Sequence, residues 1–223
     1  MARIDKTVMT KRTDGPISRY INRRISTRLT SIIIKHNIPI TPNQVSIISF
    51  LLGLLSGALF YMNHLILAGI LTQISSIIDG VDGELARALR KTSKFGGFFD
   101  AVLDRLADIS IITGLGLLII VRGGYWSFLS VDYLLVIIIA ALSGDILVSY
   151  IHARAEASLG ISLHKLCKIP VFASRDVRLF IIFVGGVLQR PLETIILVAM
   201  LSYMYVIVRL IELSLMYLRG ELK

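Results

Sequence analysis

Long apolar runs separated by short polar segments dominate the chain from residue 42 onward. Six of these runs are candidates for crossing a hydrocarbon core of about 30 Å, and they cover residues 42–62, 65–90, 96–121, 132–157, 176–190 and 191–218. Only Asn63 and His64 separate the first two runs, so these two helices must be antiparallel neighbours. The pattern predicts an all-α integral membrane bundle of six transmembrane helices.

Residues 1–41 show a different pattern. Thr13-Asp14-Gly15-Pro16 is typical of a helix start, because Pro is well tolerated in the first helical turn. In the residues that follow, one helical stripe is apolar and Arg19, Arg23 and Arg28 lie on other faces; the stripe comprises Ile17, Ile21, Ile25, Leu29, Ile32 and Ile33. This arrangement predicts an amphipathic helix in the membrane interface. A soluble helix packed on another surface is the alternative.

The segment 37–42 contains two prolines and ends this helix, and Thr41-Pro42-Asn43 begins the first membrane span. We therefore divide the chain into two parts. Residues 1–41 form a cytoplasmic N-terminal segment with the juxtamembrane amphipathic helix. Residues 42–223 form the six-helix transmembrane domain.

Composition and charge support this organisation. The 223 residues are 55% hydrophobic and carry a formal net charge of +9, with a mean hydropathy of +0.75. The basic residues flank apolar runs instead of alternating with aromatic residues, which argues against a nucleic-acid partner and favours membrane lipid or phosphorylated substrates. The single Cys167 excludes an intramolecular disulfide.

The distribution of Lys and Arg predicts the orientation in the membrane. The first residues lack the apolar core of a signal peptide, so we expect the N-terminus to stay in the cytoplasm. With that orientation only Arg122 and Arg190 fall outside. The sequence predicts a multi-pass protein of the cell membrane, with both termini and the active site on the cytoplasmic side.

Four carboxylates lie where a membrane protein tolerates few. Each Asp at the centre of a bilayer helix costs roughly 2.5–3.5 kcal/mol on insertion scales, so Asp79, Asp82, Asp100 and Asp104 need a compensating ligand or a wet cavity. The first two are three residues apart and the last two are four apart, so each pair shares one helix face. All-oxygen ligation favours Mg²⁺ or Mn²⁺ over zinc. We predict a divalent-metal site.

Small residues accompany the carboxylates. Gly83, Ala86 and Gly96 would let a backbone or a planar ligand approach the helices closely, although ordinary helix packing is the alternative for each glycine alone. Arg87 could offset carboxylate charge or hold a phosphate. It could equally mark the cytoplasmic edge of the helix.

The residues Asp79-x-x-Asp82-Gly83-x-x-Ala86-Arg87, eight further residues and Gly96-x-x-x-Asp100-x-x-x-Asp104 resemble the complete signature of the CDP-alcohol phosphotransferase family, also called CDP-alcohol phosphatidyltransferases. The resemblance implies a homodimer of six-helix protomers, each with a polar cavity that faces the cytoplasm. In that cavity an acceptor hydroxyl would displace CMP from a CDP-alcohol donor.

The resemblance also implies roles for individual residues. Asp79, Asp82 and Asp100 would be metal ligands for Mg²⁺ or Mn²⁺, with two ions expected. Asp104 would be the general base and a further metal ligand. The CDP-alcohol would contact Asp79, Asp82 and Arg87, together with Asn43, Gly83, Ala86 and Gly96.

A phosphorylated acceptor requires cationic donors near the cavity. Arg175 and Arg178 are three residues apart at the start of the fifth run and meet this requirement. Lys165 is a weaker candidate, and Asp145, inside the fourth run, is a further acceptor-site candidate. Positive charge at the inner membrane edge is the alternative explanation for the basic residues.

Residues 13–26 resemble the start of the membrane domain of di-myo-inositol phosphate phosphate synthases, which implies transfer from CDP-inositol to inositol phosphate. A cytidylyltransferase would then act as a separate partner. A phospholipid synthase that uses CDP-diacylglycerol or CDP-archaeol with inositol phosphate or glycerol phosphate is the alternative within the family. A divalent-cation transporter is the alternative of another class, but the outer halves of the runs are almost purely apolar.

Overall fold

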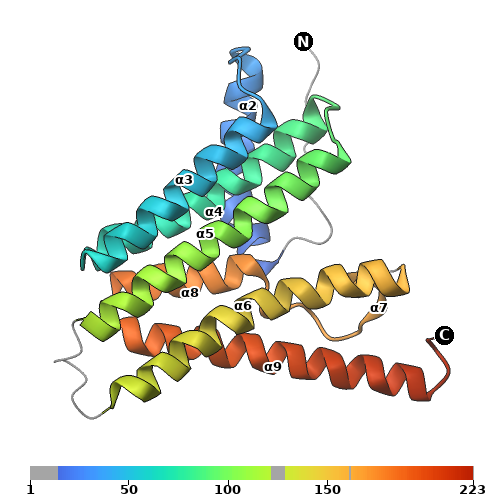
Figure 1. Ribbon diagram of the computed structural model, residues 1–223. Helices are drawn as coiled ribbons and strands as arrows, with labels where there is room; N and C mark the ends of the chain where they lie inside the picture. The colour runs from blue at the N-terminus through green and yellow to red at the C-terminus, as the bar shows by residue number, and fades with distance from the viewer. Residues whose placement is uncertain (1–14, 122–128, 161, 223) are drawn as a thin grey trace.

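The computed structural model describes residues 15–121, 129–160 and 162–222, and every regular element in these ranges is a helix. A short π-helical turn, η1 (Ser18–Asn22), leads directly into α2 (Arg23–Lys35). The remaining helices are α3 (Pro42–Tyr61), α4 (Leu65–Ala88), α5 (Lys94–Val121), α6 (Val131–Leu159), α7 (Leu163–Leu166), α8 (Arg175–Val187) and α9 (Pro191–Leu218). The predicted all-α class is confirmed (Figure 1).

The predicted runs agree with α3, α4, α5, α6, α8 and α9 within a few residues at each end. The start of α3 shows why. The Thr41 side chain accepts a hydrogen bond from the Gln44 N–H, and the Gln44 side chain accepts one from the Thr41 N–H at 2.8 Å. This reciprocal capping and Pro42 at the first helical position fix the N-terminus of the helix.

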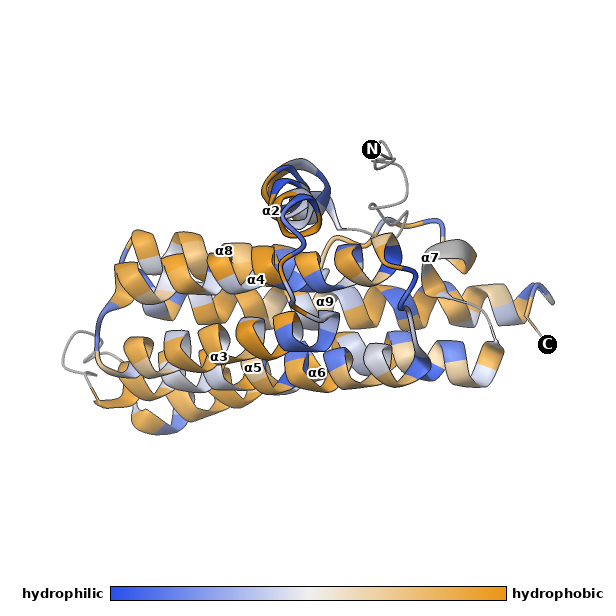
Figure 2. Cartoon of the chain, turned by 90° about the horizontal axis from the view of Figure 1, so that it is seen from above, coloured by the Kyte–Doolittle hydropathy of each residue, from blue (hydrophilic) through white to orange (hydrophobic). Residues whose placement is uncertain are grey.

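The long helices form one elongated bundle. α3 packs against both α4 and α5, α4 packs against α8, and α9 packs against α6 and α8. A buried apolar cluster joins these helices, and its members include Phe60, Ile111, Leu115, Ile182 and Ile195. Figure 2 shows the long helices lengthwise and α2 nearly end-on above α4, so α2 crosses the bundle instead of extending it.

Four helices within the described ranges are long and apolar enough to span a membrane, namely α3, α4, α6 and α9. The chain is therefore a multi-pass membrane protein, and four of the six predicted spans qualify as crossing helices by length and composition. The 13 residues of α8 reach only about 20 Å. The last 18 residues of α5 contain Asp104, Arg105 and Asp108, so the side chains of the predicted site reduce the apolar length of that helix.

The N-terminal helix presents its polar face to the bundle. Ser26 and Thr30 are completely buried against α4, whereas Ile25 and Ile32 are 43% and 50% exposed. Leu29 and Ile33 pack beside a small cluster formed by Val45, Val81 and Leu85. The predicted apolar stripe is thus divided between the outer surface and this contact.

Close backbone contact brings α5 against α3. A Cβ atom added at Gly114 would collide with the carbonyl oxygen of Gly57, and one added at Gly57 would collide with the carbonyl of Ser110. Since only glycine leaves room for such an approach, these residues set the separation of the two helices. This contact places the charged half of α5 at a defined distance from α4, which packs on the same helix α3.

Candidate active site

Three of the four predicted metal-ligating aspartates converge. Asp79 and Asp82 from α4 and Asp100 from α5 each offer one carboxylate oxygen, and these oxygens all lie within 4.8 Å of one another. Asp79 Oδ1 and Asp100 Oδ1 are buried and have no hydrogen-bond partner in the described part of the chain. Buried, unpartnered oxygens in an all-carboxylate set fit a hard divalent cation such as Mg²⁺ or Mn²⁺.

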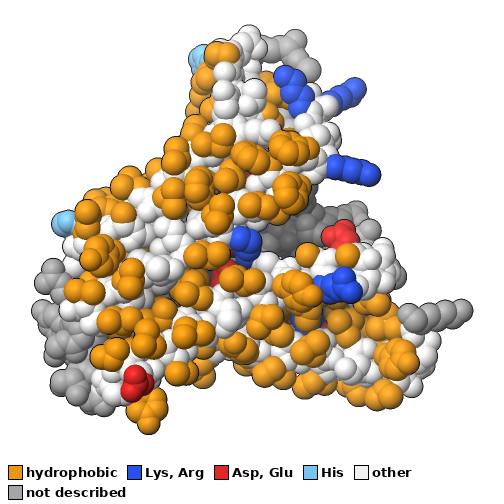
Figure 3. Space-filling model, in the orientation of Figure 1, with side chains coloured by type: hydrophobic (Ala, Val, Ile, Leu, Met, Phe, Trp, Pro, Cys, Tyr) orange, Lys and Arg blue, Asp and Glu red, His pale blue; other side chains and the backbone are white. Residues whose placement is uncertain are grey.

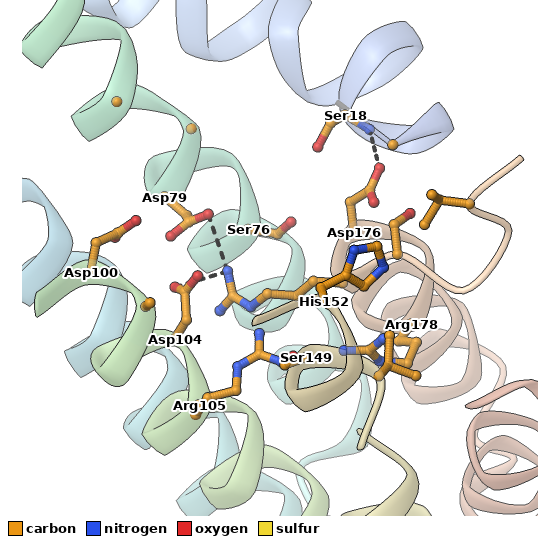
Figure 4. A pocket seen from close by; sticks show the side chains of 18 of the residues that line it. Ser18, Ser76, Asp79, Asp100, Asp104, Arg105, Ser149, His152, Asp176 and Arg178 are labelled. Atoms are coloured by element: carbon orange, nitrogen blue, oxygen red, sulfur yellow. Dashed lines mark hydrogen bonds and ion pairs between the residues drawn. The ribbon is translucent and has the colours of Figure 1, made fainter. Parts of the chain in front are cut away.

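Asp104 lies one helical turn beyond Asp100 on α5 (Figure 4), and Arg175 bridges it to Asp79. The Arg175 Nη1 atom lies 3.1 Å from Asp79 Oδ2 and 3.0 Å from Asp104 Oδ1. The Nε atom of the same guanidinium donates to both carboxylate oxygens of Asp108, at 3.0 and 3.1 Å. One arginine from α8 therefore contacts three acidic side chains from α4 and α5.

The carboxylate of Asp82 is oriented by two donors. The Ser46 hydroxyl on α3 donates to Oδ2, and the backbone N–H of Gly83 donates to Oδ1. Asp82 is only 6% exposed, so these contacts hold it within the protein interior. Sequence reasoning missed Ser46, although it is in the second turn of the helix that begins at Pro42.

A cavity of about 950 Å³ opens beside the carboxylates, with walls from η1, α2, α4, α5, α6 and α8. Of the residues expected to contact the CDP-alcohol, Asp79, Asp82, Gly83 and Arg87 line it. Among the described lining residues the other three, Asn43, Ala86 and Gly96, are absent. Asn43 and Gly96 instead lie beside each other, since a Cβ on Gly96 would be 3.5 Å from Asn43 Oδ1.

The acceptor candidates belong to a buried charge network on the other side of the cavity. Arg178 Nε donates to Asp145 Oδ1 at 2.6 Å. Arg105 Nη2 lies 2.7 Å from Asp108 Oδ2, and Arg105 Nη1 lies 3.6 Å from Asp145 Oδ2. Asp145 is 3% exposed and is absent from the cavity lining within the described ranges, so its carboxylate holds Arg178 from behind.

Several donors in this network have no partner. Within the described chain, Arg175 Nη2, Arg178 Nη2 and Ser174 Oγ are buried and form no hydrogen bond. All three residues line the cavity. Buried cationic donors without partners are suited to an anionic ligand.

Two residues of the connection between α6 and α8 bear on the sequence predictions. The side chain of Lys165 lies outside the described part of the structure. Burial raises the pKa of the Cys167 thiol above its usual value, and the nearby Arg209 opposes this effect. A thiol with a raised pKa is largely protonated at neutral pH, which argues against a nucleophilic role.

Sequence reasoning also missed Glu84 and Arg105. Glu84 is completely buried and accepts hydrogen bonds from the N-terminal helix. The polar positions 23, 26, 27 and 30 share one face of that helix and could have indicated a polar partner. Arg105 directly follows Asp104 and lies three residues before Asp108, and a cation between these aspartates was the available signal.

Comparison with known proteins assigns the family. A model of the CDP-alcohol phosphatidyltransferase family matches residues 39–216, a range that includes the four aspartates and both arginines of α8. The chain belongs to the CDP-alcohol phosphatidyltransferase family. The resemblance and the enzyme class predicted from sequence are therefore confirmed, and the transporter alternative has no support.

Two curated proteins are similar to this chain over most of its length. The chain is 41% identical over 172 residues to a bifunctional IPC transferase and DIPP synthase of Thermococcus kodakarensis, covering 75% of this chain but 36% of that protein. It is 40% identical over 177 residues to an archaetidylinositol phosphate synthase of Pyrococcus horikoshii, covering 78% of this chain and 83% of that protein. The chain thus spans little more than a third of the bifunctional relative.

Solved structures share the fold. A phosphatidylinositol phosphate synthase of Mycobacterium tuberculosis with CDP-DAG bound aligns with a TM-score of 0.69 at 24% identity, covering 85% of this chain and 93% of that one. The same enzyme in complex with manganese and citrate aligns with a TM-score of 0.67 at 25% identity, covering 83% and 87%. A divalent metal is therefore documented in a related enzyme of this CDP-alcohol phosphatidyltransferase fold.

Proposed function

We propose that this chain transfers the substituted phosphate of a CDP-alcohol to a hydroxyl of an inositol phosphate and releases CMP. The observation that carries the proposal is that two oppositely charged groups of side chains line one cavity. Asp79 and Asp100 present unpartnered carboxylate oxygens, and Arg175 and Arg178 present unpartnered guanidinium nitrogens. Such a cavity can hold a metal-bound pyrophosphate beside a phosphorylated acceptor.

The donor would bind at the carboxylates. Asp79, Asp82 and Asp100 would hold Mg²⁺ or Mn²⁺, which offsets the negative charge of a pyrophosphate and of departing CMP. We propose two ions, with Asp104 as a further ligand. Gly83 and Arg87 line the cavity beside these residues and would contact the nucleotide.

The acceptor would bind between the two groups of side chains. Arg178 Nη2, Arg175 Nη2 and Ser174 Oγ would donate to its phosphate. An acceptor hydroxyl oxygen then attacks the donor phosphorus that carries the alcohol, the bond from that phosphorus to the CMP oxygen breaks, and Asp104 takes the hydroxyl proton. Arg175 orients Asp104 for this transfer through their ion pair.

Two classes of donor are candidates, and they differ in the alcohol attached to CDP. CDP-inositol is our leading candidate, because the chain is similar to DIPP synthases and residues 13–26 resemble the start of their membrane domain. A CDP-lipid is the second candidate, since the cavity-lining side chains Ile146 and Tyr150 of α6 are 42% and 59% exposed on the apolar surface. Figure 3 shows charged side chains emerging between hydrophobic ones near the middle of one face, which would allow lateral entry from a bilayer.

We further propose that α5 and α8 lie in the membrane with the four apolar helices, and that the site faces the cytoplasm. The turns α3–α4 and α8–α9 lie at one end of the bundle, and α2, the α4–α5 turn and the C-terminus lie toward the other (Figure 1). Arg87, Arg90, Lys91 and Lys94 gather at the second end, which supports an inner location for that end. The homodimer and the separate cytidylyltransferase stay predictions.

The test is a transfer assay with purified protein, Mg²⁺ and inositol phosphate. CDP-inositol and CDP-archaeol are offered in separate reactions, and CMP and the joined product are quantified. Product from CDP-inositol supports the leading assignment, and product from CDP-archaeol alone moves the assignment to a lipid donor. Absence of CMP release with both donors, and also with CDP-diacylglycerol, would refute the proposed function.

A further inference from the structure

Glu84 lies in the aspartate motif, two residues after Asp82, but points to a different helix. Its side chain is completely buried, and Arg23 Nη1 forms an ion pair with Oε1 at 2.7 Å. The hydroxyls of Ser26, Thr27 and Thr30 donate to the same carboxylate at 2.6, 3.3 and 2.8 Å. We call Glu84 and these four donors the Glu84 network. All its donors belong to α2.

The contact of η1 and α2 with α4 continues beyond this network. Arg23 Nη1 also donates to the carbonyl oxygen of Gly80, at 3.1 Å, in the segment between Asp79 and Asp82. Asn22 Nδ2 donates to Ser76 Oγ at 3.1 Å, and its Oδ1 accepts from Gln73 at 2.7 Å. The polar contacts therefore follow one face of α4 from Gln73 to Glu84, alongside the carboxylates that face the cavity.

The same N-terminal segment reaches the arginine side of the cavity. The backbone N–H of Ser18 donates to Asp176 Oδ2 at 2.6 Å, and Asp176 is the residue after Arg175. Ser18, Asn22, Arg23 and Ser26 line the cavity, as Figure 4 illustrates for Ser18. The segment from residue 18 to residue 30 thus connects the helix that carries the metal-ligand candidates with the helix that carries the acceptor candidates.

We propose that Glu84 is a positioning residue for the metal site. By holding α2 on α4 it fixes the orientation of the turn from Asp79 to Asp82, and by way of Ser18 it fixes this turn relative to α8. Such a carboxylate is expensive to bury in a membrane protein unless its donors are in place, so α4 adopts this orientation together with α2. The inference rests on the proposed function for its catalytic consequence, whereas its effect on metal binding can be measured without turnover.

A role in stability alone predicts a different result. If Glu84 only joined two helices, its loss would lower the melting temperature and leave the ligand affinities of the folded protein unchanged. A positioning role predicts weaker metal binding by protein that is still folded, because Arg23, which pairs with Glu84, also donates to the Gly80 carbonyl between Asp79 and Asp82. Direct partners of metal ligands change affinity by about 10–100-fold, and we expect the lower end of this range for Glu84, which acts through Arg23. The metal affinity of the folded variants therefore distinguishes the two roles.

The experiment compares Mn²⁺ binding to purified wild-type, Glu84→Ala and Glu84→Gln proteins, without substrate, by electron paramagnetic resonance titration. We expect the Mn²⁺ Kd of Glu84→Ala to rise about tenfold. Glu84→Gln should recover most of the affinity, because its amide oxygen accepts from Arg23 and Ser26 while the Thr30 hydroxyl can accept from its NH₂ group. Hydrogen exchange of the α2 amides should be faster in Glu84→Ala, as expected for a helix that has lost its contacts.

Glu193→Ala is the matched control, since Glu193 forms an exposed ion pair with Arg190 outside the described cavity lining. Its Mn²⁺ Kd should equal that of the wild type. If Glu84→Ala does not fold, the Ser26→Ala/Thr30→Val double variant removes two donors and keeps the ion pair, and should raise the Kd by about threefold. A Kd within twofold of the wild type in every folded variant of the network would overturn the proposal. If the wild type binds Mn²⁺ but releases no CMP, the proposed function fails and the binding comparison still decides the role of Glu84.

Discussion

The Arg175 guanidinium on α8 lies against the Asp104 carboxylate on α5, with 3.0 Å between Nη1 and Oδ1. Asp108, one turn further along α5, accepts two hydrogen bonds from Arg175 Nε and holds the arginine in place. The proposed base is therefore oriented by a cation whose remaining Nη2 donor is unpartnered in the described chain. Arg175 would therefore both orient Asp104, which takes the proton, and bind the phosphate of the acceptor substrate.

Asp104→Asn should abolish CMP release and preserve the fold. An amide at this position keeps the volume of the side chain but cannot take the proton of the acceptor hydroxyl, a loss worth about 10²–10⁴-fold in rate. The measurement is the initial rate of CMP release at saturating donor and acceptor. Asp132→Asn, an exposed aspartate in the first turn of α6, is the control and should retain the wild-type rate. A normal rate in Asp104→Asn would refute the assignment of the base.

Chelation of divalent cations should stop turnover reversibly. Asp79, Asp82 and Asp100 provide only oxygen ligands, so Mg²⁺ or Mn²⁺ should restore CMP release after treatment with EDTA. Asp100→Asn replaces one charged ligand with a neutral oxygen and should raise the Mn²⁺ concentration needed for half-maximal activity by at least tenfold. Activity that persists in EDTA, or an unchanged metal requirement in Asp100→Asn, would contradict the metal site.

Arg178→Ala should destabilise the protein by about 3–5 kcal/mol, because it leaves the buried Asp145 carboxylate without its main partner. The free energy of unfolding in detergent is the quantity to measure. The Arg178→Ala/Asp145→Ala double variant should recover part of this loss, because no buried charge is then left unpaired.

Arg190→Ala is the matched control for the buried pair. Arg190 and Glu193 form an exposed ion pair with 3.3 Å between Nη1 and Oε1, and such pairs contribute about 0–1 kcal/mol. Equal losses of stability in Arg178→Ala and Arg190→Ala would contradict the argument that a buried ion pair is more costly to break than an exposed one.

Gly114→Ala should lower the melting temperature, because the added methyl group collides with the carbonyl oxygen of Gly57 and separates α5 from α3. Gly97 lies on the same helix, and a Cβ added there would meet nothing within 4 Å. Gly97→Ala should therefore leave the melting temperature unchanged or raise it slightly. Thermal unfolding of both variants in detergent makes the comparison. A loss in Gly97→Ala as large as that in Gly114→Ala would contradict the packing argument.

Much of the fold could be predicted from local sequence. Pro42 begins α3, as was expected because the proline ring is compatible with the first helical turn. The carboxylate pairs were expected on common faces from the helical period alone. That Asp79, Asp82 and Asp100 converge also depends on α3, which packs against both helices and whose Gly57 determines how closely α5 approaches.

The partners of the charged side chains could not be predicted in this way. Arg175 was expected to bind an acceptor phosphate, but its contacts with Asp79, Asp104 and Asp108 join residues up to 96 positions apart. Spacing along one helix carries no information about such pairs. Hydropathy does not mark α5 as a span for a related reason, since the requirement for a charged site reduces the apolar length of that helix.

The orientation of α2 has a consequence for how the protein can be shortened. Its serine and threonine face closes over a glutamate of α4, while its isoleucines Ile25 and Ile32 point outward. A truncated chain beginning at Pro42 would keep every aspartate of the signature. It would, however, expose the Glu84 carboxylate to hydrocarbon or detergent. Residues 18–35 therefore belong to the smallest unit expected to bind metal, and a boundary drawn by hydropathy alone would cut through it.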